Sequence, residues 1–207
     1  MKENKVLYNI VKGICSVILR ILYWPKVYGK KNIPKEGSFI LAGNHKHAYD
    51  PVLAMINTKR IIHYFAKEEV SGGFHGFIMR KIGTIIVYKD RNKNVTSVME
   101  AEKILKNGGV IGIFPEGTRN RTDKPIQKFK TGTVNMAQKT NTIIVPFAIR
   151  GTFKIFKKGL EIEYGKPLDV SNIEVEEAND LLKNEVLKLL KNNMSKETVP
   201  LAESRKI

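Results

Sequence analysis

In the stretch SFILAGNHKHAYDP, residues 38–51, an apolar run typical of a buried strand ends in a turn that carries His45, His47 and Asp50. Histidine is the side chain whose unperturbed pKa lies nearest neutrality, so it can accept a proton from a reacting group. A neighbouring carboxylate can hold the ring in one tautomer and stabilise its charged form. We therefore predict that His45 and Asp50 form a general-base pair.

The spacing of this pair requires a turn between its two members. Five positions along a continuous helix would place His45 and Asp50 on different faces, so the side chains can meet only if the chain folds back. Gly43 before the pair and Pro51 after it permit such a fold. Two simpler interpretations remain: His45 as an ordinary turn histidine, and Asp50 as the N-cap of a helix that begins at Pro51. The capping role does not exclude catalysis.

Composition indicates one globular domain with a strongly basic surface. The chain has 207 residues, is 42% hydrophobic and carries a formal net charge of +16. Its length allows a full core, and its charge favours phosphate-bearing partners such as nucleic acid, anionic lipid or an acidic carrier protein. The single Cys15 excludes an internal disulfide and a cysteine-based metal cage, and no zinc-ligand spacing occurs. We expect no metal or bound cofactor.

The N-terminal residues 6–24 are predicted to form an amphipathic helix. Large apolar residues recur at helical spacing, while polar residues that include Lys12 and Arg20 recur on the other side. These two charges interrupt the run of about 20 uncharged residues that a membrane span needs, and no small-residue cleavage site follows. We expect the helix to lie in the headgroup plane, with Tyr23 and Trp24 as an aromatic anchor. The alternative is a terminal helix packed on the domain's own core.

From Pro25 onward, short apolar runs alternate with helical patterns, which predicts an α/β fold with a mixed, largely parallel central sheet flanked by helices. The runs at residues 110–114 and 143–147 do not alternate in polarity, so both faces of the sheet should be covered, and site residues should lie beyond the C-terminal ends of strands. The expected strands are residues 26–28, 38–42, 61–66, 84–88, 110–114 and 143–149. The expected helices are residues 51–56, 74–82, 97–106 and 131–139, with another inside residues 169–193. We divide the chain into the helix at 1–25, the domain at 26–193 and a polar tail at 194–207.

A second group of polar residues follows the strand expected at residues 110–114. The sequence FPEGTR, residues 114–119, combines a proline turn with a carboxylate, a glycine, a hydroxyl and a guanidinium. Backbone amides at a glycine turn, together with Thr118 and Arg119, can hold a phosphate or a carboxylate. The alternative is a surface turn with a solvated arginine, in which Glu116 pairs with Arg119 or caps a loop.

Taken together, these two motifs resemble the glycerolipid acyltransferase family that includes the 1-acyl-sn-glycerol-3-phosphate acyltransferases. The family signature N-H-x-x-x-x-D is met by Asn44, His45 and Asp50, and F-P-E-G-T-R is matched at all six positions. The segments GTIIVYKDR, residues 83–91, and IVP, residues 144–146, are similar to two weaker family motifs. In the first of these the family arginine falls on Lys89, whereas Arg91 comes two residues later, so both remain candidates.

The resemblance implies transfer of a fatty acyl group from a thioester carrier, acyl-CoA or acyl-ACP, to the sn-2 hydroxyl of lysophosphatidate (1-acyl-sn-glycerol-3-phosphate). The product would be phosphatidate, in phospholipid biosynthesis. His45 would accept the hydroxyl proton with Asp50 orienting its ring, and no acyl-enzyme would form. Glu116 would position the glycerol backbone or Arg119. The glycerol phosphate would be held by Gly117, Thr118, Arg119 and either Arg91 or Lys89. His47 occupies a variable position of the motif and is expected to be a turn or pocket residue.

Two basic clusters, Lys124-Lys128-Lys130 and residues 152–158, are candidates for docking the carrier or an anionic membrane, and solvated faces are the alternative. We expect a peripheral, monotopic enzyme at the cytoplasmic face of the cell membrane. Other acceptors, namely glycerol-3-phosphate, another lysophospholipid or an ornithine lipid precursor, are alternatives within the family. A non-catalytic binder of anionic membranes or nucleic acid is the alternative outside it, although no nucleic-acid-binding signature accompanies the charge.

Overall fold

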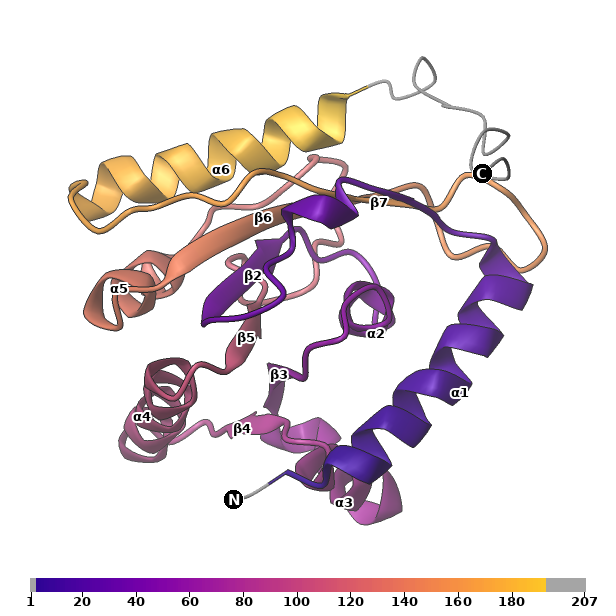
Figure 1. Ribbon diagram of the computed structural model, residues 1–207, viewed down its shortest axis with the longest axis horizontal. Coiled ribbons are helices and arrows are strands. Elements are labelled where there is room, and N and C mark those ends of the chain that lie inside the picture. The colour runs from indigo at the N-terminus through magenta and orange to yellow at the C-terminus, as the bar shows by residue number, and fades with distance from the viewer. Residues whose placement is uncertain (1–2, 193–207) are drawn as a thin grey trace, which may run out of the picture.

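The computed structural model describes residues 3–192, apart from the side chains of residues 91–93 (Figure 1). The tail expected at residues 194–207 lies outside the described residues. The strands are β1 (Lys26–Tyr28), β2 (Phe39–Gly43), β3 (Ile62–Lys67), β4 (Ile85–Val87), β5 (Val110–Ile113), β6 (Ile143–Arg150) and β7 (Glu161–Tyr164). The helices are α1 (Lys5–Tyr23), α2 (Asp50–Met55), α3 (Gly73–Lys81), α4 (Arg91–Lys106), α5 (Gly132–Lys139) and α6 (Val175–Lys191), with the short 3₁₀ helices η1 (Lys30–Asn32) and η2 (Glu68–Val70).

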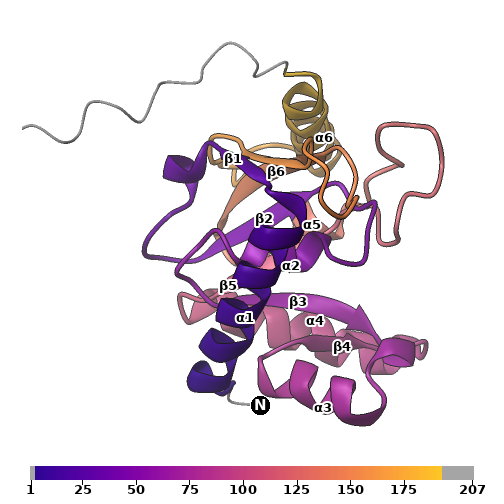
Figure 2. The same ribbon diagram turned by 90° about the vertical axis from the view of Figure 1, so that its right-hand side faces the viewer.

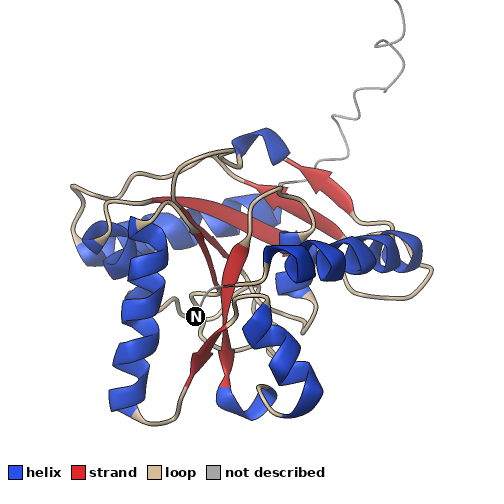
Figure 3. Cartoon of the chain, turned by 60° about the horizontal axis from the view of Figure 1, so that its bottom comes forward, coloured by secondary structure: helices blue, strands red, loops and turns tan. Residues whose placement is uncertain are grey.

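The strands form one seven-stranded sheet in the order β1-β7-β6-β2-β5-β3-β4. Every neighbouring pair is parallel except β6 and β7, which are antiparallel. This confirms the predicted α/β fold with a mixed, largely parallel sheet. Figure 3 shows helices on both sides of the strands. The apolar runs of β5 and β6 require this arrangement, because neither face of these strands is exposed to solvent.

Each face of the sheet has its own core. Side chains of α1 and α2 pack with Phe39, Leu41 and Val145 on one face. Side chains of α4, α5 and α6 pack with Ile40, Ile111 and Ile144 on the other. Neighbouring residues of one strand therefore point into opposite cores, and the two helix layers lie on opposite sides of the sheet in Figure 1.

The parallel register brings the two sequence motifs to one edge of the sheet. Ala42 of β2 is level with Ile113 of β5, and Gly43 is level with Phe147 of β6. The segments that follow β2 and β5 therefore leave the sheet side by side. This is the edge at which ligands bind in open α/β sheets.

The strand β7 and the first six residues of α4 were missed by the sequence analysis. The sequence of β7 is EIEY, and its two glutamates suggest an exposed loop, but both form ion pairs with Arg150 of β6 at 3.1 and 2.6 Å. Helix α4 begins at Arg91, six residues before the predicted start at residue 97. Its first turn is polar, so the apolar periodicity on which the prediction relied begins only later.

Helix α1 lies at the margin of the domain in Figure 1 and in front of it in Figure 2, so the domain covers it from one side. Tyr8, Leu19 and Tyr23 are buried, the Tyr8 hydroxyl accepts the N–H of Ile62 at 3.0 Å, and the Lys12 ammonium donates to the carbonyl of Thr58. The other side exposes a row of apolar residues that we call the α1 stripe. It consists of Val6, Ile10, Ile14, Val17, Ile18, Ile21 and Trp24.

The predicted amphipathic helix is thus present. One of its edges packs on the domain's core, as the alternative interpretation expected, and the stripe is left exposed, so its position in the headgroup plane stays a prediction. By length and composition alone α1 also satisfies the requirement for a membrane span, as do core helices and signal sequences near an N-terminus. The attachment through Tyr8, Lys12 and Tyr23 holds this helix along the surface of the domain.

Candidate active site

His45 and Asp50 meet in the turn between β2 and α2. His45 Nδ1 lies 2.9 Å from Asp50 Oδ2, and the same oxygen accepts the backbone N–H groups of Lys46 and His47, each at 2.7 Å. Asp50 is fully buried and His45 is partly exposed. Because Nδ1 is occupied by the carboxylate, Nε2 is the nitrogen left to act as a base.

The carboxylate of Asp50 folds back over the turn instead of capping a helix. Helix α2 begins at Asp50 itself, its N-cap residue is Tyr49, and that cap makes no side-chain hydrogen bond. The N-cap interpretation of Asp50 is therefore wrong. The backbone N–H groups that donate to Asp50 precede it in the chain, as does the His45 ring. The side chain therefore points backward, and five residues suffice to bring it against His45.

Asn44 anchors this turn to the neighbouring strand. Its side-chain amide donates to the carbonyl of Ile149 at 2.9 Å, and its carbonyl accepts the N–H of Ile149 at 2.7 Å. Asn44 is fully buried, so these two bonds satisfy polar groups that water does not reach. The motif asparagine thus holds His45 in place relative to β6, a role that the sequence did not reveal because Ile149 is far away in the chain.

Glu116 connects the two motifs directly. Its Oε1 accepts the N–H of His45 and its Oε2 accepts the N–H of Gln127, both at 2.8 Å. Burial raises the pKa of Glu116, and the two backbone hydrogen bonds oppose that rise. Both carboxylate oxygens are engaged by the backbone. Of the expected roles, loop capping is the one observed, whereas pairing with Arg119 is not among the described contacts.

Two further contacts hold His45, one at its ring and one at its backbone. The ring stacks on Phe114 with ring centroids 4.0 Å apart and planes inclined by 18°. The N–H of Asn120 donates to the carbonyl of His45 at 2.6 Å. Phe114 and Asn120 flank the EGTR turn, so the same segment that binds the His45 backbone also packs against its ring.

The rest of the second motif is open to solvent. Gly117, Thr118 and Arg119 are exposed, and Gly117 has a φ of +69°, a conformation that suits glycine. A Cβ atom at Gly117 would lie 2.9 Å from the Nζ of Lys130. The Lys130 ammonium therefore lies over this turn and adds a cation that the sequence analysis placed only in a general basic cluster.

The two candidates for a further phosphate ligand lie beyond β4, and in the sheet order β3 separates β4 from β5. Lys89 is exposed and forms an ion pair with Glu69 at 3.2 Å. Arg91 is the first residue of α4, and its side chain lies outside the described residues. Among the described contacts, neither is brought to the EGTR turn.

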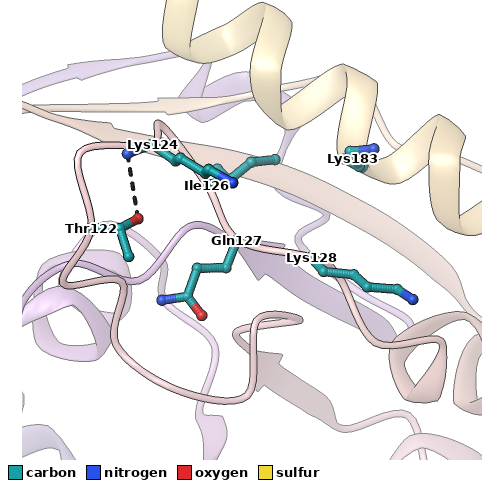
Figure 4. A pocket seen from close by; sticks show the side chains of 6 residues that line it. All are labelled: Thr122, Lys124, Ile126, Gln127, Lys128 and Lys183. Atoms are coloured by element: carbon teal, nitrogen blue, oxygen red, sulfur yellow. Dashed lines mark hydrogen bonds between the residues drawn. The ribbon is translucent and has the colours of Figure 1, made fainter.

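A hollow of about 390 Å³ lies on the segment that follows this turn (Figure 4). Its wall contains Gln127, whose backbone N–H binds Glu116, so the hollow adjoins the site. The remaining lining residues are Thr122, Lys124, Ile126, Lys128 and Lys183. Two of the lysines expected to form a basic cluster therefore share a cavity with a third lysine from α6.

The side chains of the other histidines form none of the described hydrogen bonds with Asp50 or Glu116. His47 stacks on Phe153 with centroids 4.5 Å apart, as expected for a residue of the turn. His63 is buried with its Nδ1 2.8 Å from the carbonyl of Gly83, and His75 is exposed. Among the described residues no cluster of three or more histidine, cysteine or acidic side chains could hold a metal ion.

The arrangement is that of an enzyme in which a carboxylate-oriented histidine stands beside a cationic glycine turn. The Acyltransferase family model matches residues 25–150, more than half of the chain, and the chain belongs to this family of acyltransferase enzymes. This confirms the resemblance carried by the residues around His45 and Glu116.

Curated relatives extend the likeness beyond the matched domain. A 1-acyl-sn-glycerol-3-phosphate acyltransferase of Bacillus subtilis is 33% identical over 168 residues, which cover 78% of this chain and 82% of that protein. A protein of the same name from Borreliella burgdorferi is 30% identical over 177 residues, which cover 79% and 70%. The fold is similar to the crystal structure of the 1-acyl-sn-glycerophosphate (LPA) acyltransferase PlsC from Thermotoga maritima. The TM-score is 0.71 at 22% sequence identity, covering 91% of this chain and 81% of that one.

Proposed function

We propose that the protein transfers a fatty acyl group from a thioester carrier to the sn-2 hydroxyl of 1-acyl-sn-glycerol-3-phosphate, and so forms phosphatidate for phospholipid biosynthesis. The observation that carries this proposal is the link through Glu116, which joins the His45–Asp50 pair to the EGTR turn. A base for a hydroxyl and a cationic turn for a phosphate are the two things that this acceptor needs. The names of the two relatives support the same acceptor.

In the proposed reaction His45 Nε2 takes the proton of the sn-2 hydroxyl as its oxygen attacks the thioester carbonyl. The imidazolium is stabilised by Asp50, whose oxygen stays bonded to Nδ1. Collapse of the tetrahedral intermediate breaks the C–S bond, and the leaving sulfur takes the proton back from His45. The thioester already supplies an activated acyl group, so neither an acyl-enzyme nor a metal or bound cofactor is needed.

The acceptor's phosphate is held, in this proposal, by Arg119 and Lys130 with the hydroxyl of Thr118. The expected contact from the amide of Gly117 is left out, because that N–H donates to the carbonyl of Phe114 at 2.9 Å. Arginine offers a planar fork of donors, and lysine adds a compact charge. Lys89 or Arg91 would contribute to binding the phosphate only from the segment that follows β4. Glu116 acts on the reaction through His45, since its two oxygens hold the backbone on either side.

The acyl carrier is assigned to the hollow lined by Lys124, Lys128 and Lys183. Coenzyme A and acyl carrier protein both bear phosphate, and Gln127 in the wall of this cavity donates its backbone N–H to Glu116, which also accepts the N–H of His45. Peripheral attachment to the cytoplasmic face of the membrane through the α1 stripe would bring the enzyme to its lipid acceptor.

The test is an acyl-transfer assay with purified protein, lysophosphatidate and either acyl-CoA or acyl-ACP. We expect His45→Ala and Asp50→Asn each to lower kcat by about 10²- to 10⁴-fold, the range of general-base catalysis. His75→Ala is the matched control, since His75 is an exposed histidine outside the site, and it should leave kcat unchanged.

Undiminished transfer by His45→Ala would refute the general base. Transfer to glycerol-3-phosphate, to another lysophospholipid or to an ornithine lipid precursor, with none to lysophosphatidate, would retain the mechanism and replace the acceptor. Binding of anionic membranes or nucleic acid with no transfer to any acceptor would refute the enzymatic proposal.

A further inference from the structure

The loop between β6 and β7, residues 151–159, presents large apolar side chains to solvent. Ile155 is 56% exposed and Phe156 is 64% exposed. The cations Lys154, Lys157 and Lys158 alternate with them and are also exposed. Exposed aromatic and aliphatic side chains flanked by lysines are typical of segments that insert shallowly into a membrane surface.

This loop is joined to the C-terminal end of α1. The N–H of Phe156 donates to the carbonyl of Leu22 at 2.7 Å, and the rings of Phe156 and Trp24 lie 6.2 Å apart. Figure 1 shows the orange loop beside the end of α1. The α1 stripe ends at Trp24, so its apolar surface continues directly onto Phe156.

Phe153 connects the same loop to the active-site turn. Its ring stacks on His47 at 4.5 Å and makes edge contacts with Tyr23 at 5.4 Å and with Tyr49 at 5.9 Å. Tyr23 belongs to α1, whereas His47 and Tyr49 belong to the turn that carries His45. This side chain of the loop therefore contacts both helix α1 and the active-site turn.

We propose that the loop at residues 151–159 and the α1 stripe form one continuous surface that inserts into the headgroup layer of an anionic phospholipid bilayer. The apolar row would enter the acyl boundary, and the three lysines would contact lipid phosphates. Through Phe153 this surface sets the position of the His45 turn relative to the lipid. The inference takes its acceptor from the proposed function, but the binding surface itself is argued from exposure and charge.

The protein offers a built-in probe, because Trp24 is the single tryptophan of the chain and lies against Phe156. The experiment mixes the full-length protein with vesicles of equal parts phosphatidylglycerol and phosphatidylcholine, whose acyl chains carry bromine as a quencher. We expect the wild-type Trp24 fluorescence to be quenched. The double substitution Ile155→Ser with Phe156→Ser should lower the vesicle partition coefficient roughly tenfold, since two large apolar side chains are lost.

The matched control removes equally exposed apolar side chains from another surface. Val95 and Met99 of α4 are 59% and 60% exposed, and α4 packs on the core of the opposite sheet face. Val95→Ser with Met99→Ser should bind vesicles as the wild type does. Circular dichroism before and after heating establishes that both variants remain folded.

Three results would overturn the proposal. The loop variant could bind vesicles as tightly as the wild type, or the α4 control could lose as much binding as the loop variant. Alternatively, the wild type could fail to bind vesicles and form a dimer that the loop substitutions dissociate. In that case a second copy of the chain covers the surface. None of these readouts requires catalysis, so a failure of the proposed acyl transfer is observed separately.

Discussion

The most consequential single residue after His45 is Glu116, a buried carboxylate with two backbone donors. Its oxygens bind His45 N–H and Gln127 N–H at 2.8 Å, so it joins the turn that carries His45 to the cationic segment that carries Gln127. An amide in its place can accept only one of these bonds and would direct its NH₂ group at the other N–H. Glu116 is therefore a positioning residue whose charge matters to its geometry.

We predict that Glu116→Gln lowers kcat by about 10²-fold, the effect of a small misplacement of the base. The pH dependence provides a second readout. Because burial raises the pKa of Glu116 above its unfolded value, the folded protein binds this proton more readily than the unfolded chain. The stability contributed by Glu116 is thus complete below the unfolded pKa and is lost as pH rises through the folded pKa.

Urea unfolding of wild type and Glu116→Gln, measured from acidic to neutral pH, checks this sign. The stability of the wild type relative to the variant should fall across the interval between the unfolded and folded pKa values. A difference that is constant with pH would contradict the prediction, and so would a difference that rises.

At the scale of elements, the site depends on how closely β2 and β6 approach. Gly43 is level with Phe147, and a Cβ atom added at Gly43 would lie 2.4 Å from the carbonyl oxygen of Phe147 and 2.7 Å from its ring. No larger residue fits here without moving one of the two strands. Since Asn44 and His45 follow directly, any such movement is transmitted to His45.

We predict that Gly43→Ala lowers the free energy of unfolding by about 1–3 kcal/mol through overpacking and reduces acyl transfer. Gly13→Ala in α1 is the matched control, because a Cβ atom there meets nothing within 4 Å. It should raise the free energy of unfolding by roughly 0.5–1 kcal/mol, the usual gain for alanine in a helix interior. Denaturant unfolding of both variants measures this contrast, and an unaffected Gly43→Ala would show that the strands can separate at no cost.

For the whole molecule, the question is what the formal charge of +16 does. The structure separates two clusters of three lysines each. One lines the hollow next to Glu116, and the other lies on the loop at residues 151–159. Charge alone would make them equivalent, since long-range attraction depends mainly on the total. We propose that the first cluster binds the acyl carrier and that the second binds the lipid surface.

Two triple variants with equal net charge distinguish these uses. Lys124→Gln, Lys128→Gln and Lys183→Gln together should raise the KM for the acyl carrier about tenfold and leave vesicle binding nearly unchanged. Lys154→Gln, Lys157→Gln and Lys158→Gln together should weaken binding to anionic vesicles about 10²-fold, at roughly 1 kcal/mol per lysine, with little effect on carrier KM. Equal effects of both variants on both measurements would mean that only the total charge matters.

The amino-acid sequence alone determined the fold class, the pairing of His45 with Asp50 and the family. Each follows from local information: apolar runs bounded by turn residues, a histidine and a carboxylate within one turn, and two short motifs. The same local view missed β7, because the glutamates of EIEY look solvated until Arg150 of the neighbouring strand pairs with them. It also left open a helix cap for Asp50, because the backward fold of its side chain depends on donors in the turn.

Only the tertiary structure decided that Glu116 holds the backbone of His45, that Asn44 binds Ile149 and that Lys130 lies over Gly117. The structure alone also showed that the loop at residues 151–159 joins the end of α1. These contacts join residues far apart in the chain, through hydrogen bonds and packing whose partners depend on the order and register of the strands. The motifs therefore reveal which chemistry is present. The parallel arrangement of β2, β5 and β6 determines which groups meet to perform it.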